Sequence, residues 1–206
     1  MNFVNRTLVC RQHNANNKKV LPTAAVTHIV IHRTDLCVFD PVANPHPVPN
    51  ALLDGPALAE RFCNVALGCG GCIPYHFLIR VNAPTWTVEQ LLPLSIRGAH
   101  AIGYNYRSWG IAVLGDFRRA APPVGQYDAL VQLVALLLPA VRPDGLIVAG
   151  HTDLPGAAAN SKKVCPGSFL PAAKVRADAV ATLPPGWTTW TPETLATRWL
   201  DVRLAT

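Results

Sequence analysis

The sequence predicts an α/β domain in which a β-sheet carries helices packed on its faces. Short β-branched and apolar runs at residues 26–31, 109–115 and 146–149 are typical of buried strands. Apolar residues in the segment 126–140 recur with the spacing of an amphipathic helix. Strands that alternate with helices along the chain indicate a sheet with helices packed against it.

The first third of the chain contains fewer regular signals. Residues 1–25 are polar and Asn-rich, without periodicity, and are expected to form a strap over the surface. The strand at residues 26–31 leads into a proline-rich loop over residues 35–54. A helix is predicted over residues 57–66, because Asp54 is a suitable N-cap and Pro56 suits a first helical turn.

The second half of the chain supplies most of the predicted core. Residues 75–81 and 86–91 are expected to form two strands paired as a hairpin, and residues 169–182 a second packed helix. The segment 183–206 contains three of the five tryptophans, and it is interpreted as a helix packed back on the domain or as an accessory binding surface.

Length and composition indicate one domain. A chain of 206 residues with 50% hydrophobic content can bury a substantial core, and no clear linker interrupts it. We therefore predict a single domain over residues 1–206, with a strap at 1–25, a core at 26–182 and a Trp-rich extension at 183–206.

The net charge of +6 suits a polyanionic partner, although a basic surface without a charged partner explains it equally well. Lys and Arg are scattered and no nucleic-acid-binding motif is present, so no nucleic-acid partner is expected. The amino terminus lacks the apolar segment of a secretory signal, and the apolar stretch at residues 129–141 is too short to span a bilayer. No membrane insertion is expected.

Six cysteines are many for a cytosolic enzyme of this size. They are compatible with disulfides, with a second metal site, or with buried free thiols. A structural zinc is the weakest of these interpretations, because the Cys-x-x-Cys motif has no matching partner motif. At least one disulfide is expected, with its pairing left open. The cysteines are Cys10, Cys37, Cys63, Cys69, Cys72 and Cys165.

Two histidines and one cysteine form a candidate metal site. His32 ends one predicted strand and His151 follows another, so their imidazoles can meet if the two strands are neighbours. Cys165 returns on a loop and supplies a third ligand. Three protein ligands leave one tetrahedral position open, which is typical of catalytic zinc. The alternative is that each histidine is an ordinary hydrogen-bonded residue at a strand end.

Six motifs in order along the chain give the sequence a family resemblance. Over residues 26–180 it resembles the zinc-dependent N-acetylmuramoyl-L-alanine amidases of the type-2 amidase and peptidoglycan recognition protein superfamily. That resemblance implies a central mixed β-sheet flanked by helices, with a zinc ion in a groove that holds the glycan-linked peptide. The motifs are Ile-Val-Ile-His-Arg-Thr (29–34), Pro-Tyr-His-Phe-Leu-Ile (74–79), Gly-Ala-His-Ala with Gly-Tyr-Asn (98–105), Gly-Ile-Ala-Val-Leu-Gly-Asp-Phe (110–117), Gly-His-Thr-Asp (150–153) and Lys-Val-Cys-Pro-Gly (163–167).

The resemblance implies a role for each matching residue. His32, His151 and Cys165 match the zinc ligands. Tyr75 matches a tyrosine near the zinc-bound water, and Lys163 matches a lysine implicated in catalysis. The alternative for Tyr75 is an ordinary aromatic residue of a strand, and the alternative for Lys163 is a solvent-exposed charge.

Three further residues are expected at the substrate groove. His100 and Asn105 lie in a stretch that lines this groove in relatives, although either could instead shape its loop. Arg33 stands where many relatives have a second histidine or a small residue, and we expect it to contact substrate. Ala112 and the cysteine ligand both favour the recognition-protein and phage-lysozyme branch.

The resemblance implies a function. A Zn²⁺ cofactor would activate water for attack on the amide between N-acetylmuramic acid and L-alanine. The alternatives are a non-catalytic peptidoglycan receptor, a muropeptide-recycling amidase and a zinc-stabilised interaction domain.

The expected partners are peptidoglycan or muropeptide and an immunity or inhibitor protein. Without a recognisable signal peptide, the enzyme is expected to reach the periplasm or cell wall through a secretion apparatus or lysis, as an antibacterial effector or lytic enzyme.

Overall fold

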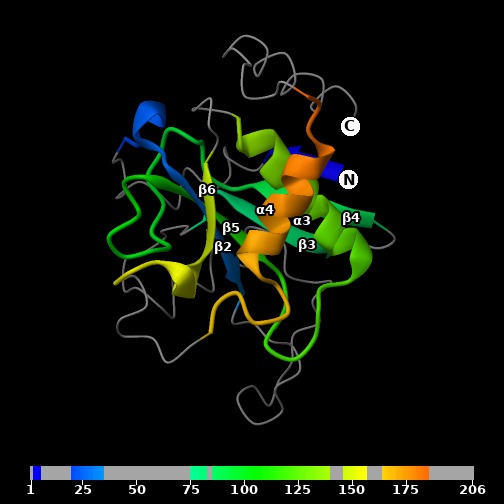
Figure 1. Cartoon of the computed structure of the whole chain (residues 1–206). Coiled ribbons are helices and arrows are strands. Elements are labelled where there is room, and N and C mark those ends of the chain that lie inside the picture. The colour runs from blue at the N-terminus through cyan, green and yellow to red at the C-terminus, as the bar shows by residue number, and fades with distance from the viewer. Residues whose placement is uncertain are drawn as a thin grey trace.

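A mixed β-sheet with two helices on one face organises the protein (Figure 1). The structure is a computed structural model, and it describes residues 2–5, 20–34, 75–82, 85–139, 146–156 and 164–185. Within these residues, six strands form one sheet in the order β1-β4-β3-β5-β2-β6.

The described elements have the following bounds. The strands are β1 (Asn2–Asn5), β2 (His28–Arg33), β3 (Phe77–Asn82), β4 (Thr85–Gln90), β5 (Ser108–Val113) and β6 (Ile147–Gly150). The helices are α3 (Val124–Leu137) and α4 (Ala172–Thr182), with short 3₁₀ turns η1 (Thr23–Ala25) and η3 (His151–Asp153).

Four adjacent strands of the sheet run parallel, with β6 at the edge. β3, β5, β2 and β6 are neighbours in that order, so their carboxyl ends lie at the same edge. β4 pairs antiparallel with β3, as a hairpin requires, and β1 pairs parallel with β4. The sheet is therefore mixed, and functional groups that follow these four parallel strands can gather at their carboxyl ends.

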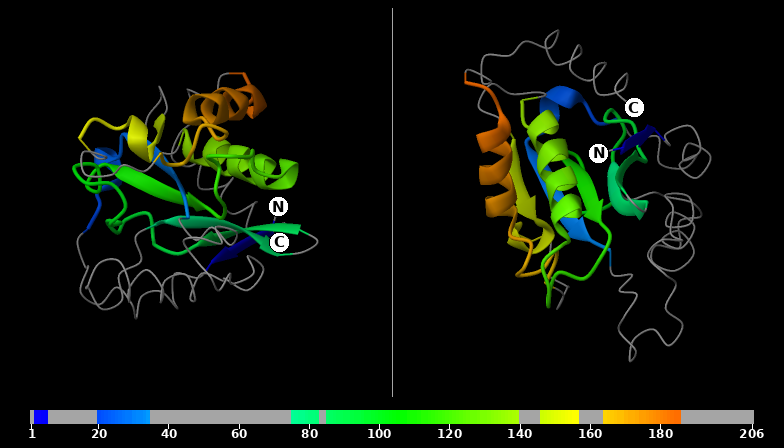
Figure 2. Two further views of the ribbon diagram at one scale, coloured as in Figure 1. Left: turned by 90° about the horizontal axis from the view of Figure 1, so that it is seen from below. Right: turned by 90° about the vertical axis from the view of Figure 1, so that its right-hand side faces the viewer.

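Side-chain alternation along β2 gives the sheet two different faces. Ile29 and Ile31 pack in the main core with residues of α3 and α4, which lie side by side over that face (Figure 2). Val30 packs in a smaller cluster with Ala149 and residues of the 101–104 turn. His32 follows the alternation of Val30 and is buried on the face opposite the helices.

Prolines mark the helix ends. α3 begins directly after Pro123, and it ends before Pro139, which has no backbone N–H to continue the hydrogen-bond ladder. α4 begins directly after Pro171. The predicted start at residue 169 is therefore three residues early, because the extended Pro171 separates the turn at Phe169 from the helix.

The predicted core strands, their hairpin and both packed helices are confirmed. The prediction of a surface strap over residues 1–25 is wrong for Asn2–Asn5, which form edge strand β1, with Phe3 in the core. Residues 2–5 form a strand because they pair with β4. The segment is too short to show the alternation of apolar and polar residues that would predict a strand. The predicted helix at 57–66, the segment 186–206 and the cysteines at 10, 37, 63, 69 and 72 lie outside the described residues.

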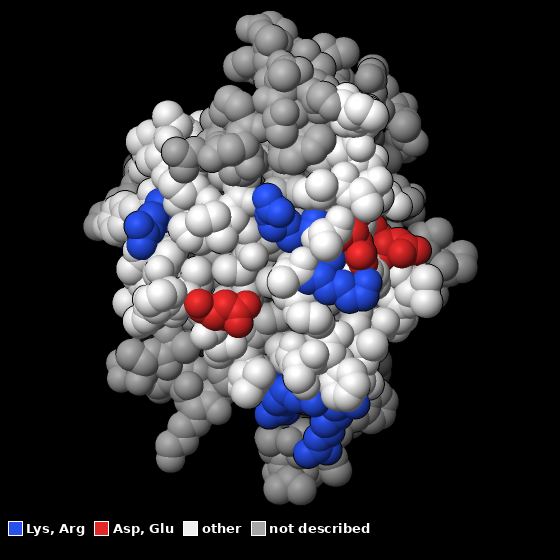
Figure 3. All heavy atoms as spheres, in the orientation of Figure 1, with Lys and Arg blue, Asp and Glu red and all other residues white. Residues whose placement is uncertain are grey.

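Charge is dispersed on the face viewed in Figure 3. There the described Lys and Arg side chains lie in separate groups, with uncharged surface between them. Among the described helices, none has the length and apolar content needed to cross a bilayer.

Candidate metal centre

The parallel pairing of β2 with β6 brings two histidines together. Its register places Ile31 beside Gly150, so His32 in β2 and His151 after β6 lie abreast. The centroids of the two imidazole rings are 4.8 Å apart. The condition stated from the sequence, that the two strands be neighbours, is met.

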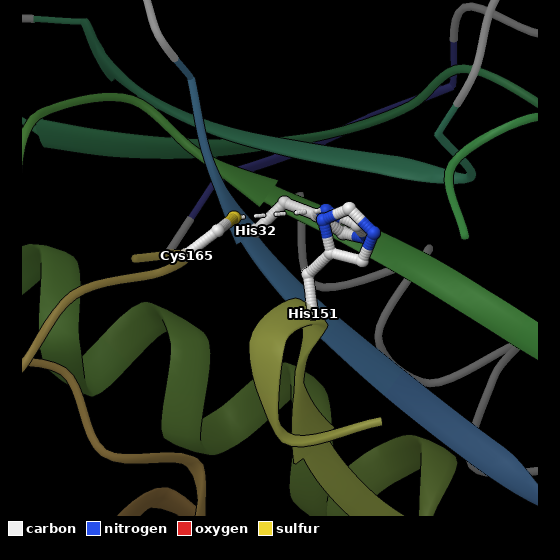
Figure 4. A group of neighbouring side chains, drawn as sticks. All are labelled: His32, His151 and Cys165. Atoms are coloured by element: carbon white, nitrogen blue, oxygen red, sulfur yellow. Dashed lines mark hydrogen bonds between the residues drawn. The ribbon is translucent and has the colours of Figure 1, made fainter. Parts of the chain in front are cut away.

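Cys165 completes a cluster of three donor atoms. Its sulfur lies 3.8 Å from Nδ1 of His32, and its thiol is not in a disulfide. Figure 4 shows the three side chains converging from β2, the η3 turn and the loop before α4. The ligand atoms of His32, His151 and Cys165 all lie within 4.8 Å of one another. Two imidazoles and one thiolate are ligands that zinc prefers, and three leave a position open.

Burial keeps the His32 imidazole in the form that binds a metal. Burial, and then the neighbouring His100 and His151, hold the pKa of His32 well below its ordinary 6.5. Burial and His76 lower the pKa of His100 to about 3. Because a metal binds only an unprotonated ring nitrogen, His32 is ready to ligate at neutral pH. The donor set of two imidazoles and one thiol fits zinc in its chemistry.

Hydrogen bonds tie the loop of Cys165 to the turn of His151. The backbone N–H and the hydroxyl of Thr152 both donate to the Cys165 carbonyl, at 3.0 and 2.9 Å. Asp153 accepts a bond of 2.8 Å from the Gly150 N–H and so closes the η3 turn. A Cβ at Gly150 would lie 2.7 Å from the ring of Pro166, so glycine lets the two segments approach. The turn that carries His151 therefore positions the loop that carries Cys165.

Arg33 supports the same loop from the other face of the sheet. Its guanidinium donates to the Val164 carbonyl, directly before Cys165, and lies 3.8 Å from Asp116. The side chain is only 2% exposed. Since neighbours on a strand point to opposite faces, Arg33 cannot share the face of His32. The contacts shown are within the protein, and the expected substrate contact of Arg33 stays a prediction.

His100 lies against the candidate metal ligand His32. The two rings meet edge-on, with His100 Nδ1 3.0 Å from His32 Nε2. Asn105 shapes this turn, because its side-chain oxygen accepts from the backbone N–H groups of His100 and Ala101, at 2.9 and 2.8 Å. Asn105 therefore makes the contacts of a loop-shaping residue, which is the alternative given for it in the sequence analysis. Substrate roles for His100 and Asn105 stay predictions.

Tyr75 lies beside the cluster, and Lys163 lies outside the described residues. The ring of Tyr75 is 5.0 Å from the ring of His32, and the residue is 9% exposed. The structure therefore brings Tyr75 together with His32, His151 and Cys165.

Comparison with known proteins identifies the family. The family model described as N-acetylmuramoyl-L-alanine amidase matches residues 22–168, which is well over half of the chain. The chain belongs to this amidase family. A curated relative, a peptidoglycan-recognition protein of Drosophila melanogaster, is 30% identical over 146 residues, which cover 69% of each chain.

Solved structures share the fold of this amidase-family chain. The endolysin of Thermus scotoductus bacteriophage Ph2119 matches with a TM-score of 0.62 at 20% identity, over 86% of this chain and 98% of that one. The amidase LysC of Clostridium intestinale matches with a TM-score of 0.58 at 24% identity, over 86% and 96%. At these identities the likeness concerns the fold, and it confirms the predicted amidase-like mixed sheet flanked by helices.

Three residues that hold the site received no role from the sequence. Thr152 and Asp153 stand next to a ligand, and the spacing of Gly150 and Asp153 is typical of a polar side chain that closes a turn. Ser108 begins β5 as an ordinary strand residue, and its contact with His100 gives no signal along the chain.

Replacement of Arg33 should loosen the loop of Cys165 in this amidase-family protein. Because Arg33→Met removes a buried donor from the Val164 carbonyl, we expect a loss of about 1–3 kcal/mol in the free energy of unfolding. Zinc affinity should fall as well. Arg118→Met is the matched control, since Arg118 also pairs with Asp116 but is 42% exposed. Urea unfolding and zinc titration measure both effects, and equal behaviour of the two variants would contradict the supporting role.

Acid should destabilise the metal-free protein. His76 and His100 have pKa values lowered by burial to about 4 and about 3, so they stay neutral when folded. Below pH 6.5 the unfolded chain takes up these protons and the folded protein does not, so stability present above pH 6.5 is lost as the pH falls toward 4. The loss should reach about 1.4 kcal/mol per pH unit for each histidine. Urea unfolding between pH 7 and 5 measures the slope, which His76→Asn should reduce.

Proposed function

We propose that this protein is a zinc-dependent amidase that hydrolyses the bond between N-acetylmuramic acid and L-alanine in peptidoglycan. The carrying observation is the cluster of His32, His151 and Cys165, which offers a metal three ligands beside Tyr75. Membership of the amidase family supports the reaction class. The substrate would be polymeric peptidoglycan or a muropeptide.

Each residue of the centre has a chemical role in this proposal. His32, His151 and Cys165 would hold the ion, and zinc supplies a Lewis acid that activates water and polarises the scissile carbonyl. The Tyr75 hydroxyl would orient the attacking water or donate a hydrogen bond to the carbonyl oxygen as its negative charge develops. Lys163 would add positive charge to the same oxygen.

Recognition without catalysis is the second candidate. The curated relative from Drosophila melanogaster carries the name of a peptidoglycan-recognition protein, so binding alone is a reasonable function for this fold. The intact ligand set favours catalysis, because a receptor has no need of a thiol beside two imidazoles, and burial lowers the pKa of the His32 imidazole.

We further propose that the enzyme acts on bacterial cell walls as an antibacterial effector or lytic enzyme, with a recycling role as the alternative. A producing cell would then need protection, and an immunity protein that covers the metal centre would provide it. Co-expression with a gene neighbour that abolishes wall digestion would support this role. Preference for soluble muropeptides over intact sacculi would favour recycling instead.

Removal of one ligand tests the metal and the reaction together. Cys165→Ser should lose zinc and amidase activity at once, because serine is a poor zinc ligand at neutral pH. Zinc content is measured by elemental analysis, and activity by mass spectrometry of stem peptides released from purified sacculi. A chelator should stop the wild-type enzyme. Full zinc content in Cys165→Ser would contradict the ligand assignment, and binding of sacculi without release of peptides would support recognition alone.

Tyr75→Phe and Lys163→Ala separate catalysis from metal binding. Each should keep its zinc and lose about 10²- to 10³-fold in turnover, the usual effect of removing a group that stabilises a developing oxyanion. Lys162→Ala is a matched control for the lysine, being its neighbour in the chain. Full activity in both Tyr75→Phe and Lys163→Ala would remove these residues from the mechanism.

A further inference from the structure

A chain of buried hydrogen bonds ends on the metal ligand His32. It starts at the Tyr104 carbonyl, which accepts a bond of 2.7 Å from the Ser108 hydroxyl. A serine hydroxyl has one hydrogen, and this bond uses it. Toward His100 Nε2, 3.4 Å away, the Ser108 oxygen can therefore act only as an acceptor. Ser108 is fully buried, so water does not compete for this position.

The direction of the first bond determines the direction of the next. If Ser108 accepts from His100, then Nε2 of His100 carries the hydrogen, and Nδ1 of its neutral ring has only a lone pair. That Nδ1 atom lies 3.0 Å from Nε2 of His32 and must accept from it. His32 then carries its own hydrogen on Nε2. Its Nδ1 atom is left with a lone pair that faces the sulfur of Cys165, 3.8 Å away.

We propose that Ser108 and His100 set the tautomer of His32 and so present its Nδ1 atom to the metal. The inference rests on the proposed metal centre but not on the reaction performed there. It makes His100 a positioning residue that acts through a ligand, in place of the substrate contact expected from the sequence. Second partners of this kind hold a ligating ring in orientation and raise its affinity for the ion.

The surroundings of His100 keep its ring in place. Gly110 on β5 leaves the space, because a Cβ there would lie 2.7 Å from the imidazole. Asn105 holds the backbone on both sides of the residue through its side-chain oxygen. The ring is thus confined between a strand and a capped turn, and its nitrogens keep their partners. Because the His100 ring is held in place, its Nδ1 atom can keep accepting from His32 Nε2–H and so maintain one tautomer of His32.

Nuclear magnetic resonance tests the proposal directly on the metal-free, reduced wild-type protein. Long-range ¹H–¹⁵N correlations of ¹⁵N-histidine distinguish a ring protonated on Nε2 from one protonated on Nδ1. We expect His32 and His100 both to show the Nε2–H pattern at pH 7. A His32 ring protonated on Nδ1, or averaged between the two tautomers, would overturn the proposal.

Variants at His100 test the consequence for the metal. His100→Leu removes the acceptor for His32 Nε2–H, and zinc affinity should fall about 10- to 100-fold. His100→Asn can place its side-chain oxygen near the position of Nδ1, so it should restore most of that affinity. His28→Asn is the matched control, because it makes the same substitution on β2 outside the chain of bonds. A loss in the Leu variant that is no larger than the loss in the Asn variant would mean that His100 does not act as a hydrogen-bond acceptor, which would refute its positioning role.

Ser108→Ala provides a second test that keeps both rings. It removes the hydroxyl acceptor of His100 and leaves the Ser108 backbone, which also hydrogen-bonds to His100. The His100 and His32 signals should therefore shift in part toward mixed tautomers. Unchanged signals would contradict the role of the Ser108 hydroxyl. Failure of the proposed function remains distinguishable: wild-type protein that shows the fixed tautomer and binds zinc but releases no stem peptide would leave this inference intact and refute the amidase activity.

Discussion

The register between β2 and β6 is the constraint on which the candidate site depends. Ile31 pairs with Gly150, so the next residue of each segment is a histidine, and the two rings lie abreast. Because side chains alternate between the faces of a sheet, a shift of one residue would move His32 into the helix-covered core. β2 is held between β5 and β6, and its apolar residues are fully buried, which makes such a shift costly.

The face of the sheet that carries the site is unusually rich in buried imidazoles. His32, His76 and His100 are all buried, and burial keeps their pKa values low enough for neutrality. His76 uses both nitrogens within the fold, since one bonds to the Ile96 carbonyl and the other accepts from the Gly110 N–H. Satisfied hydrogen bonds offset the cost of burying these polar rings. The result is a preorganised polar face, which suits catalysis better than a mobile one.

The position of Cys165, the third candidate ligand, depends on contacts from two directions, because it lies on a loop and not in a strand. Thr152 binds its carbonyl from the turn of His151, and Arg33 binds the preceding carbonyl from the end of β2. Thr152 follows His151 in the chain and Arg33 follows His32, so both contacts start next to a histidine of the cluster. The strand pairing that aligns the two imidazoles therefore also positions the thiol, and one structural feature organises all three donors.

The sequence by itself determined the elements of the core and the identity of the metal-ligand candidates. The strand at residues 26–31 and the helix at residues 126–140 were predictable from the spacing of apolar residues along the chain, because that spacing indicates which side of a strand or helix is buried. Only the tertiary structure decided that Asn2–Asn5 form a strand, since β4 supplies their pairing. It also decided that Arg33 turns toward the Cys165 loop and that Ser108 and His100 lead to His32. The physical reason is that hydrogen bonds between segments distant in the chain depend on register and turn geometry, which no local pattern of residues records.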